Sequence, residues 1–217
     1  LLKLDRKMMA AVLLTALFMN AGNYGLPVID IAFGGTALAF ASLFFVTTAT
    51  YTNSVGVVIA SSGHTSVLKA IKGLLRLPSI YALILGIIIV RLGVDLHPTL
   101  DRTIDMLAGA SIPSMLVLLG LQFVNIKLDG QLRPLLLVSA MRLLVAPLLA
   151  IGLTRLFGMT GPAYQATVLE AGMPSAVLTT VLATEFDCQP SFVTTVVFAT
   201  TLLSPLTLTP LLYFLGA

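Results

Sequence analysis

The sequence is poor in charge, cysteine and histidine, and these shortages exclude several classes of protein. Only 10% of its 217 residues are charged, against roughly 25% in a soluble domain. The single cysteine, Cys188, excludes an internal disulfide framework. The two histidines, His64 and His97, fall in loops that we predict on opposite sides of a membrane, so they cannot share a metal ion. We therefore predict neither a disulfide-stabilised domain nor a metal site.

Signatures of enzymes and of nucleic-acid binding are also missing from the sequence. There is no Gly-x-Ser-x-Gly nucleophile elbow, no His-Glu-x-x-His zinc motif and no phosphate-binding P-loop. The formal net charge of +3 is small and its positive residues are scattered, which does not favour a nucleic-acid partner. We therefore predict that the protein is not an enzyme, that it needs no cofactor and that it binds no nucleic acid.

Apolar sequence is what the chain has in abundance. Its residues are 58% hydrophobic and its mean hydropathy is +1.04. Apolar stretches of eighteen or more residues recur, each long enough to cross a bilayer as a helix, and no flexible linker separates them. We predict one all-α membrane domain surrounded by lipid. Its seven spans are expected at about 8–33, 37–61, 78–90, 106–124, 134–156, 161–184 and 190–215.

Basic residues give these spans a direction. If the loop before the first span is cytoplasmic, eight Lys and Arg residues fall in inside loops and three in outside loops, which follows the positive-inside rule. The odd number of spans then leaves the C-terminus outside, in a bacterial inner (plasma) membrane. The chain begins with Leu1 and a basic stretch to Lys7, without an initiator methionine or signal peptide. We expect an N-terminally truncated fragment.

The segment Asn20–Pro27 interrupts the first span with two asparagines, two glycines and a proline. In hydrocarbon, an unpaired backbone group costs several kcal/mol, and a proline inside a helix removes one hydrogen bond. Broken membrane helices are typical of transport sites, where the ends of half-helices bind substrate or ions. The segment therefore predicts a broken helix at a transport site.

A second copy of this pattern lies further along the chain. Asn23–Pro27 matches Glu170–Pro174 as polar, any, glycine, apolar, proline, and in the same register, without a gap, Phe45–Thr48 falls on Phe192–Thr195. The first and sixth spans run in opposite directions, so the repeat is inverted. We predict that 1–61 holds the last two helices of a first repeat. Residues 62–77 are then a cytoplasmic linker, and 78–217 are a complete five-helix second repeat.

Several motifs together resemble the auxin efflux carrier family, the PIN-like transporters. They are Asn20, Asn23–Pro27, Gly34-Gly35, Arg142–Pro147, Met173–Ala176 and Thr200–Ser204. The resemblance implies a ten-helix protein of two inverted five-helix repeats, of which about seven helices are present here. It also implies that the fourth and ninth helices are broken and cross, here near Pro27 and Pro174. The family moves organic anions, such as auxin in plants and carboxylates like malate or malonate in bacteria.

Candidate site residues surround this expected crossing. Amides freed at half-helix N-termini suit a carboxylate, and asparagine side chains can donate to a substrate or cap the broken ends. Hydroxyls of the second span, with Asn53, either line the path or bond back to their own helix. The candidates for substrate binding and the crossing are Asn20, Asn23, Tyr24, Gly25, Pro27, Gly172, Met173 and Pro174.

Two ionisable residues, Arg142 and Glu170, are expected near the middle of the membrane, where such groups are expensive and usually functional. Their opposite charges predict a functional ion pair, or a proton-coupled carboxylate beside an anion-binding guanidinium. The structural alternatives are a static buried salt bridge without a transport role, or an Arg142 side chain that extends to the inner surface of the membrane.

We interpret the chain as a secondary active transporter that moves small organic anions by alternating access. The crossing bundle would move against a scaffold that includes the third and fourth spans. The coupling ion, proton or sodium, is left open, as is assembly into a homodimer. A sodium/bile-acid-type symporter of related fold is one alternative, and a cluster of acidic and amide ligands would favour it. An intramembrane enzyme or a non-transporting membrane subunit is the other, and a catalytic dyad at one depth would favour the enzyme.

Overall fold

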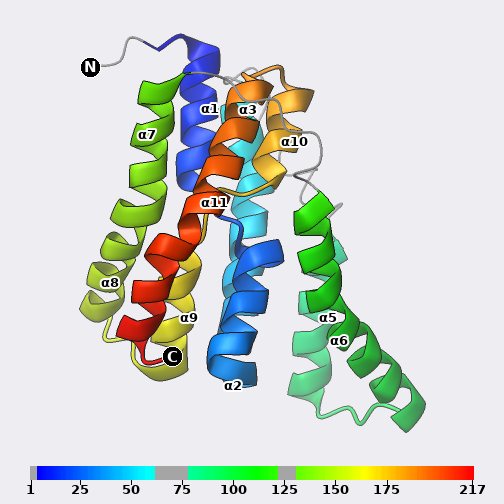
Figure 1. Ribbon diagram of the computed structural model, residues 1–217. Coiled ribbons are helices and arrows are strands. Elements are labelled where there is room, and N and C mark those ends of the chain that lie inside the picture. The colour runs from blue at the N-terminus through cyan, green and yellow to red at the C-terminus, as the bar shows by residue number, and fades with distance from the viewer. Residues whose placement is uncertain (1–3, 62–77, 122–130) are drawn as a thin grey trace.

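A computed structural model describes residues 4–61, 78–121 and 131–217. The regular elements in these ranges are all helical, which confirms the all-α prediction, and the one β-bridge among them is isolated. The predicted basic linker, 62–77, lies outside the described residues. In Figure 1 the beginning of α1 and the end of α11 lie at opposite ends of the helical bundle.

The elements divide into two halves on either side of residues 62–77. The first half contains α1 (Arg6–Leu17), the π-helical turn η1 (Ala21–Gly25), α2 (Leu26–Tyr51), the π-helical turn η2 (Thr52–Gly56) and α3 (Val57–Ala60). The second half contains α5 (Pro78–Leu92), α6 (Pro98–Leu121), α7 (Leu132–Ala140), η3 (Met141–Val145), α8 (Ala146–Leu156), α9 (Gly161–Ala171), α10 (Leu178–Glu185) and α11 (Pro190–Leu215).

Three continuous helices in the described ranges are long and apolar enough to cross a membrane: Gly35–Ala60, Leu132–Leu156 and Pro190–Leu215. They match three of the predicted spans within a few residues. The first and sixth predicted spans are each divided into two short half-helices, so neither half reaches the length of a crossing. α5 has only 15 residues. The structure thus shows three spans of the predicted seven.

The polar connection predicted before the fourth span is partly helical, which corrects its expected start. α6 begins at Pro98 rather than at the expected Met106. Proline is favoured at the first helical position, and the His97 carbonyl accepts hydrogen bonds from the Leu100 and Asp101 amides. The charged residues that suggested a loop instead lie on exposed turns of the helix. Hydropathy therefore locates the apolar part of α6, not the residue at which the helix begins.

Gly34 divides α2 into two helices. Its φ of 75° and ψ of −171° are non-helical, in a region of backbone conformation that is essentially restricted to glycine. The predicted boundary between the spans at 8–33 and 37–61 is therefore confirmed. The shorter part, 26–33, belongs to the broken first span, and the longer part continues through η2 to Ala60.

Pro27, which was expected to break a helix, and Pro147 each follow a π-helical turn. Pro27 comes two residues after η1, and Pro147 comes two residues after η3. A proline ring clashes with the carbonyl four residues earlier in an α-helix, and a local π turn is one way to accommodate it. Pro27 lies in the first turn of α2, where a missing amide hydrogen costs little. It starts a helix rather than ending one.

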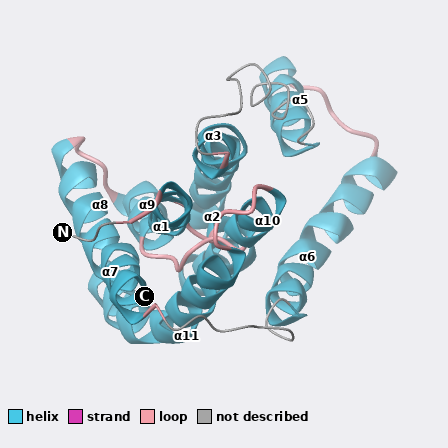
Figure 2. Ribbon diagram, turned by 90° about the horizontal axis from the view of Figure 1, so that it is seen from above, coloured by secondary structure: helices cyan, strands magenta, loops and turns pink. Residues whose placement is uncertain are grey.

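The buried apolar residues form two clusters. One joins α1 to the beginning of α11 and includes Leu14, Phe192 and Val196. The other joins the first turns of α2 to α9 and includes Ile29 and Leu169. α5 and α6 stand to one side of the remaining helices, with α6 next to η1 and α2 (Figures 1 and 2). The bundle is therefore densest around the two broken helices.

The two broken helices and the helices after them are alike in element order and spacing. In each, a half-helix, a non-helical stretch, a second half-helix and a turn precede a long helix of 26 residues. Arg6 and Gly161 begin the first half-helices, and Gly35 and Pro190 begin the long helices, with the same separation in both pairs. This correspondence places Pro27 opposite Leu182, whereas the motifs place it opposite Pro174. The elements are therefore displaced from the motif alignment by about two helical turns.

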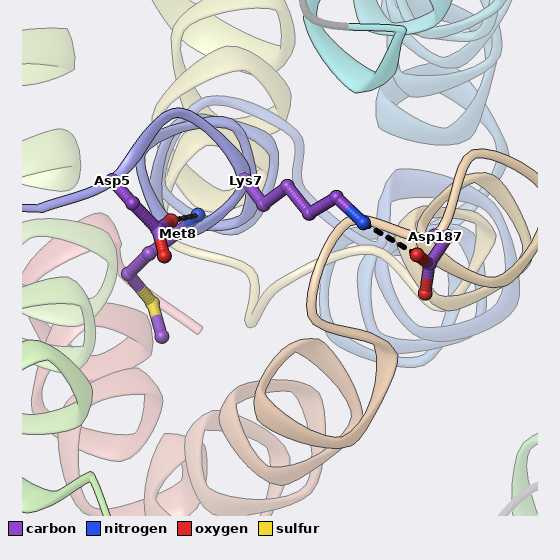
Figure 3. A network of polar contacts seen from close by, with 4 residues as sticks. All are labelled: Asp5, Lys7, Met8 and Asp187. Atoms are coloured by element: carbon purple, nitrogen blue, oxygen red, sulfur yellow. Dashed lines mark hydrogen bonds and ion pairs between the residues drawn. The ribbon is translucent and has the colours of Figure 1, made fainter.

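One polar network fixes the first half-helix at the end that lies away from the second half-helix. Asp5 caps α1 by accepting a hydrogen bond from the Met8 amide at 2.7 Å. Lys7 lies 2.5 Å from the carboxylate of Asp187, in the turn between α10 and α11 (Figure 3). Both side chains are largely exposed, so water screens the ion pair and it adds little to stability. Its value is geometric, because it links the far ends of the two broken helices.

Candidate functional site at a crossing of two broken helices

The two breaks pass each other as a short antiparallel pairing of backbone. Met19, between α1 and η1, lies opposite Ser175, between α9 and α10. The Asn20 amide donates to the Pro174 carbonyl at 2.8 Å, and the Ala176 amide donates to the Phe18 carbonyl at 2.9 Å. Backbone groups freed by breaking both helices thus satisfy each other, as the interior of a membrane demands.

This pairing corrects the expected position of the crossing. Pro174 takes part in it, whereas Pro27 lies one to two turns further along, inside the helical part of α2. The two helices break at 18–20 and 172–177, so the first break precedes the Asn23–Pro27 motif. The break therefore follows from pairing between distant segments rather than from the proline.

Four half-helix ends meet at the crossing. α1 and α9 end there, and η1 with α2 and α10 begin there. A helix carries about half an elementary positive charge at its N-terminus and half a negative charge at its C-terminus. The crossing therefore has two negative ends and two positive ends.

Arg142 and Ser175 satisfy the two C-terminal ends. The guanidinium of Arg142, on η3, donates through Nη1 to the Ala16 carbonyl at 3.1 Å and through Nη2 to the Ala171 carbonyl. The Ser175 hydroxyl donates to the Thr15 carbonyl at 2.7 Å. Arg142 is only 2% exposed. Its positive charge thus lies where the negative ends of α1 and α9 converge.

A cavity of about 290 Å³ lies at the N-terminal ends. Its lining residues include 19–23, at the first break and the start of η1, then 176–178, at the start of α10, and Phe45, Thr48 and Thr52 from the long helix. The first four amides of a helix have no acceptor within it. The side-chain nitrogen of Asn20, a residue 5% exposed, has no hydrogen-bond partner among the described residues. The starts of two half-helices and Asn20 therefore lie around one cavity.

Hydroxyl groups of the second span are already engaged. Thr48 donates to the Phe45 carbonyl at 3.0 Å, and Thr52 donates to the Thr48 carbonyl at 2.8 Å. Asn53 donates to the Ala49 carbonyl and does not line the cavity. Both alternatives that the sequence left open thus apply to these two threonines. They donate hydrogen bonds to their own helix, and they also form part of the cavity wall.

The predicted site residues fall into two groups in the structure. Asn20 and Asn23 line the cavity, whereas the other six do not. The Tyr24 hydroxyl instead accepts a hydrogen bond from Ser204 on α11 at 3.0 Å. The remaining five lie beside the cavity, on η1, on α2 or in the second break: Gly25, Pro27, Gly172, Met173 and Pro174. Residues 176–178 and 181 of the cavity were not predicted, because only the pairing with 18–20 brings them there.

Glu170 is the second buried ionisable residue, and it lies apart from the cavity. It is fully buried on α9, and neither carboxyl oxygen has a hydrogen-bond partner among the described residues. A Cβ atom added to Gly25 would come within 2.3 Å of its Oε2. No ion pair joins Glu170 to Arg142, although both residues are described. The predicted pair is therefore not formed, because the guanidinium is directed to carbonyls.

Residues 62–212 match a family described as "Membrane transport protein", and so cover more than half of the chain. The chain belongs to this transporter family. The match confirms the resemblance to the auxin efflux carriers that the motifs indicated. The family is one of membrane transporters, not of enzymes.

Two similar proteins support the assignment. An uncharacterised transporter of Methanothermobacter thermautotrophicus is 34% identical over 193 residues, which cover 87% of this chain and 62% of that protein. An uncharacterised transporter of Methanocaldococcus jannaschii is 27% identical over 215 residues, which cover 93% of this chain and 67% of that protein. The chain therefore spans about two thirds of the length of these transporters. Both are archaeal, so they give no support to a bacterial membrane in particular.

Proposed function

We propose that this transporter moves small organic anions, carboxylates in particular, and binds them in the cavity at the helix crossing. The observation that carries the proposal is that residues at the starts of two half-helices, η1 and α10, line that cavity together with Asn20, whose buried side-chain nitrogen has no hydrogen-bond partner among the described residues. Helix N-termini bind anions because their free amides and the helix dipole both favour negative charge.

The charges around the crossing support an anionic ligand. Among the described residues no Lys or Arg lines the cavity, so a carboxylate there would be held by amides and helix dipoles rather than by a salt bridge with one of them. Arg142 compensates the negative helix ends on the other side. With those ends neutralised, the positive N-termini dominate the field that a ligand in the cavity experiences.

The equal spacing of the two broken helices and their long helices supports two inverted repeats and transport by alternating access. In this proposal 1–61 ends a first five-helix repeat, 62–77 links the repeats on the cytoplasmic side, and 78–217 forms the second. Seven of ten helices are then present, in the plasma membrane, with the C-terminus outside. The bundle around the crossing moves against a scaffold that includes α5 and α6, which lie to one side of the other helices in Figure 2. Such rocking around a site at the repeat interface is the usual mechanism of folds of this kind.

Counterflow into proteoliposomes tests the proposal. The purified protein is reconstituted with unlabelled malate, malonate or indole-3-acetate inside, and the uptake of the same radiolabelled compound is measured, with choline as the cationic control. We expect at least one carboxylate to accumulate and choline not to. Accumulation of choline without any of the carboxylates would contradict the proposal.

A matched pair of variants connects transport to the cavity. Asn20→Leu removes the unpartnered amide from the wall, whereas Asn53→Leu makes the same change outside the cavity. We expect the first variant to raise the carboxylate concentration needed for half-maximal counterflow and the second to leave it near the wild-type value. Equal effects of the two substitutions would show that the carboxylate does not bind in this cavity.

A further inference from the structure

Glu170 and Gly25 form a contact that anion binding in the cavity does not explain. Glu170 lies on α9, near the end of the half-helix that stops at the crossing, and Gly25 ends η1, which starts on the other side of the crossing. The glycine has ordinary helical dihedral angles, so its backbone does not require glycine. A side chain there would meet the carboxyl group of Glu170, whose Oε2 would lie 2.3 Å from an added Cβ, so one of the two would have to shift.

Among the described residues, no hydrogen bond or ion pair would compensate a negative charge on Glu170. Arg142, whose guanidinium bonds to the carbonyl of the next residue, Ala171, has no hydrogen bond to the carboxyl group. The Tyr24 hydroxyl is bonded to Ser204 instead. The charged or titratable residues on α9 and on the elements packed against it are Tyr24, Asp30, Tyr51, Arg142, Arg155, Tyr164 and Tyr213. None of them bonds to Glu170 in the structure.

An unpaired carboxylate is strongly disfavoured in a buried site, whereas an uncharged carboxylic acid is tolerated far better. The packing of Glu170 against Gly25 therefore suits the acid form. Loss of its proton would leave a bare charge between α9 and η1, and the contact would have to open to water or to a cation. The contact thus differs in stability between the two protonation states.

We propose that Glu170 is a proton-binding site that couples proton movement to the conformation of the crossing. The proposal rests on the anion transport proposed above, and it names the coupling ion. Gly25 lies two residues after Asn23, on the half-helix whose first turn lines the cavity. Opening of the Glu170–Gly25 contact therefore moves a wall of the anion cavity.

The exchange of the proton needs no further reactant. A proton from water on one side of the membrane binds a carboxylate oxygen of Glu170, which lets the half-helices pack together. The same proton leaves to water on the other side when the contact opens there. The half-helix that begins with η1 belongs both to the Glu170–Gly25 contact and to the wall of the cavity. The protonation state of Glu170 therefore shifts the equilibrium between two conformations of the crossing, as does a ligand that binds one conformation more tightly than the other.

Uptake of radiolabelled malonate under an imposed proton gradient tests the proposal. The quantity measured is the ratio of the initial rate with a gradient to the rate at equal pH, in the wild type and in Glu170→Gln. We expect a ratio of several-fold in the wild type and a ratio near one in the variant. A ratio that survives in Glu170→Gln would overturn the proposal. Stimulation of the wild type by a sodium gradient but not by protons would overturn it as well.

A spectroscopic measurement separates this proposal from the identity of the substrate. Infrared difference spectra of the reconstituted protein, recorded between acid and alkaline pH, report the carbonyl stretch of protonated carboxyl groups. We expect one pH-dependent band that is present in the wild type and missing in Glu170→Gln. If malonate, malate and indole-3-acetate are not transported but the band is found, anion transport fails and the proton site stands. If no band depends on Glu170, the proton site fails.

Glycine variants test the contact itself. Gly25→Ala places a methyl group against the carboxyl, while Gly35→Ala adds one to a helix where nothing lies within 4 Å. We expect the first variant to lose proton-stimulated uptake and the second to retain it. If the methyl group disturbs packing, the elution profile of Gly25→Ala in detergent will be altered. Glu170→Ala removes the carboxyl group that the methyl group meets, so the double variant should again elute as a monodisperse, wild-type-like peak. It should still lack proton stimulation. Full proton stimulation in Gly25→Ala alone would show that the contact has no role in coupling.

Discussion

Replacing Arg142 by methionine removes two hydrogen bonds at the centre of the crossing while keeping an unbranched side chain. The carbonyls of Ala16 and Ala171 lose their donors, and the C-terminal ends of α1 and α9 lose a positive charge that lies between them. Interhelical hydrogen bonds in membranes average about 0.6 kcal/mol, so two of them set a lower estimate of about 1 kcal/mol for the loss of stability. Leaving two buried acceptors unsatisfied costs about 1–3 kcal/mol each and sets an upper estimate of about 6 kcal/mol.

Lysine at the same position separates charge from geometry. Arg142→Lys keeps a positive charge near the two helix ends, but a single ammonium group cannot reproduce the planar fork of a guanidinium. We therefore expect the stability of Arg142→Lys to fall between the wild type and Arg142→Met. Unfolding by denaturing detergent, followed by the helical circular dichroism signal, gives the three stabilities under one condition.

Two results would refute this reasoning. If Arg142→Met is as stable as the wild type, the guanidinium does not hold the crossing together. If both variants keep wild-type stability but lose carboxylate affinity, Arg142 contacts the substrate, and the anion-binding guanidinium inferred from the sequence is the better account. The structural position of the guanidinium, bonded to carbonyls and away from the cavity, predicts neither result.

Two further predictions concern the turn in α2 and the orientation of the chain. Gly34→Ala should lower the free energy of unfolding by about 1–3 kcal/mol because φ is 75° there, whereas Gly35→Ala should not; equal stability would show that the turn tolerates a side chain. A cysteine replacing Phe157, 77% exposed, should react with an impermeant maleimide from outside the cell, and one replacing Glu185 only after permeabilisation. Burial raises the pKa of the Cys188 thiol, so the native cysteine should stay unlabelled, and the reverse labelling pattern would invert the orientation.

Helices with local start and stop signals were predictable from the sequence. α11 begins at Pro190 and ends at Leu215, just before Gly216, whose φ is 86°, so both ends were visible as residue types. The Gly34 turn was visible for the same reason. α6 was predicted too short because the sequence shows where apolar residues begin and not where helical hydrogen bonding begins.

The crossing was predictable in kind but not in register. A proline in an apolar span signals a break, yet Pro27 sits in a first helical turn that tolerates it. The break at 18–20 is set by backbone pairing with 174–176, in the opposite half of the chain. Local propensity contains no information about that pairing. The match between the two proline motifs could therefore indicate that the first break has a partner. It could not indicate which residues of the two segments pair.

The buried charges show the same limit. Sequence depth placed Arg142 and Glu170 in the middle of the membrane, and both are fully or almost fully buried. Opposite charges at similar depth suggested a pair, but the preferred partners of Arg142 are two carbonyls that exist only because α1 and α9 end side by side. The cavity residues of α10 depend on that same arrangement.

The most direct test of an anion site at the crossing is the affinity of the cavity for malonate after Asn20→Asp. This change is nearly isosteric, and it replaces an amide in the cavity wall by a negative charge. Two like charges about 4 Å apart repel by about 4 kcal/mol at an effective dielectric constant of about 20, and about 1.4 kcal/mol corresponds to a tenfold change in affinity. Isothermal titration calorimetry should show malonate binding at least about tenfold weaker than in the wild type. Unchanged or tighter binding would contradict the account.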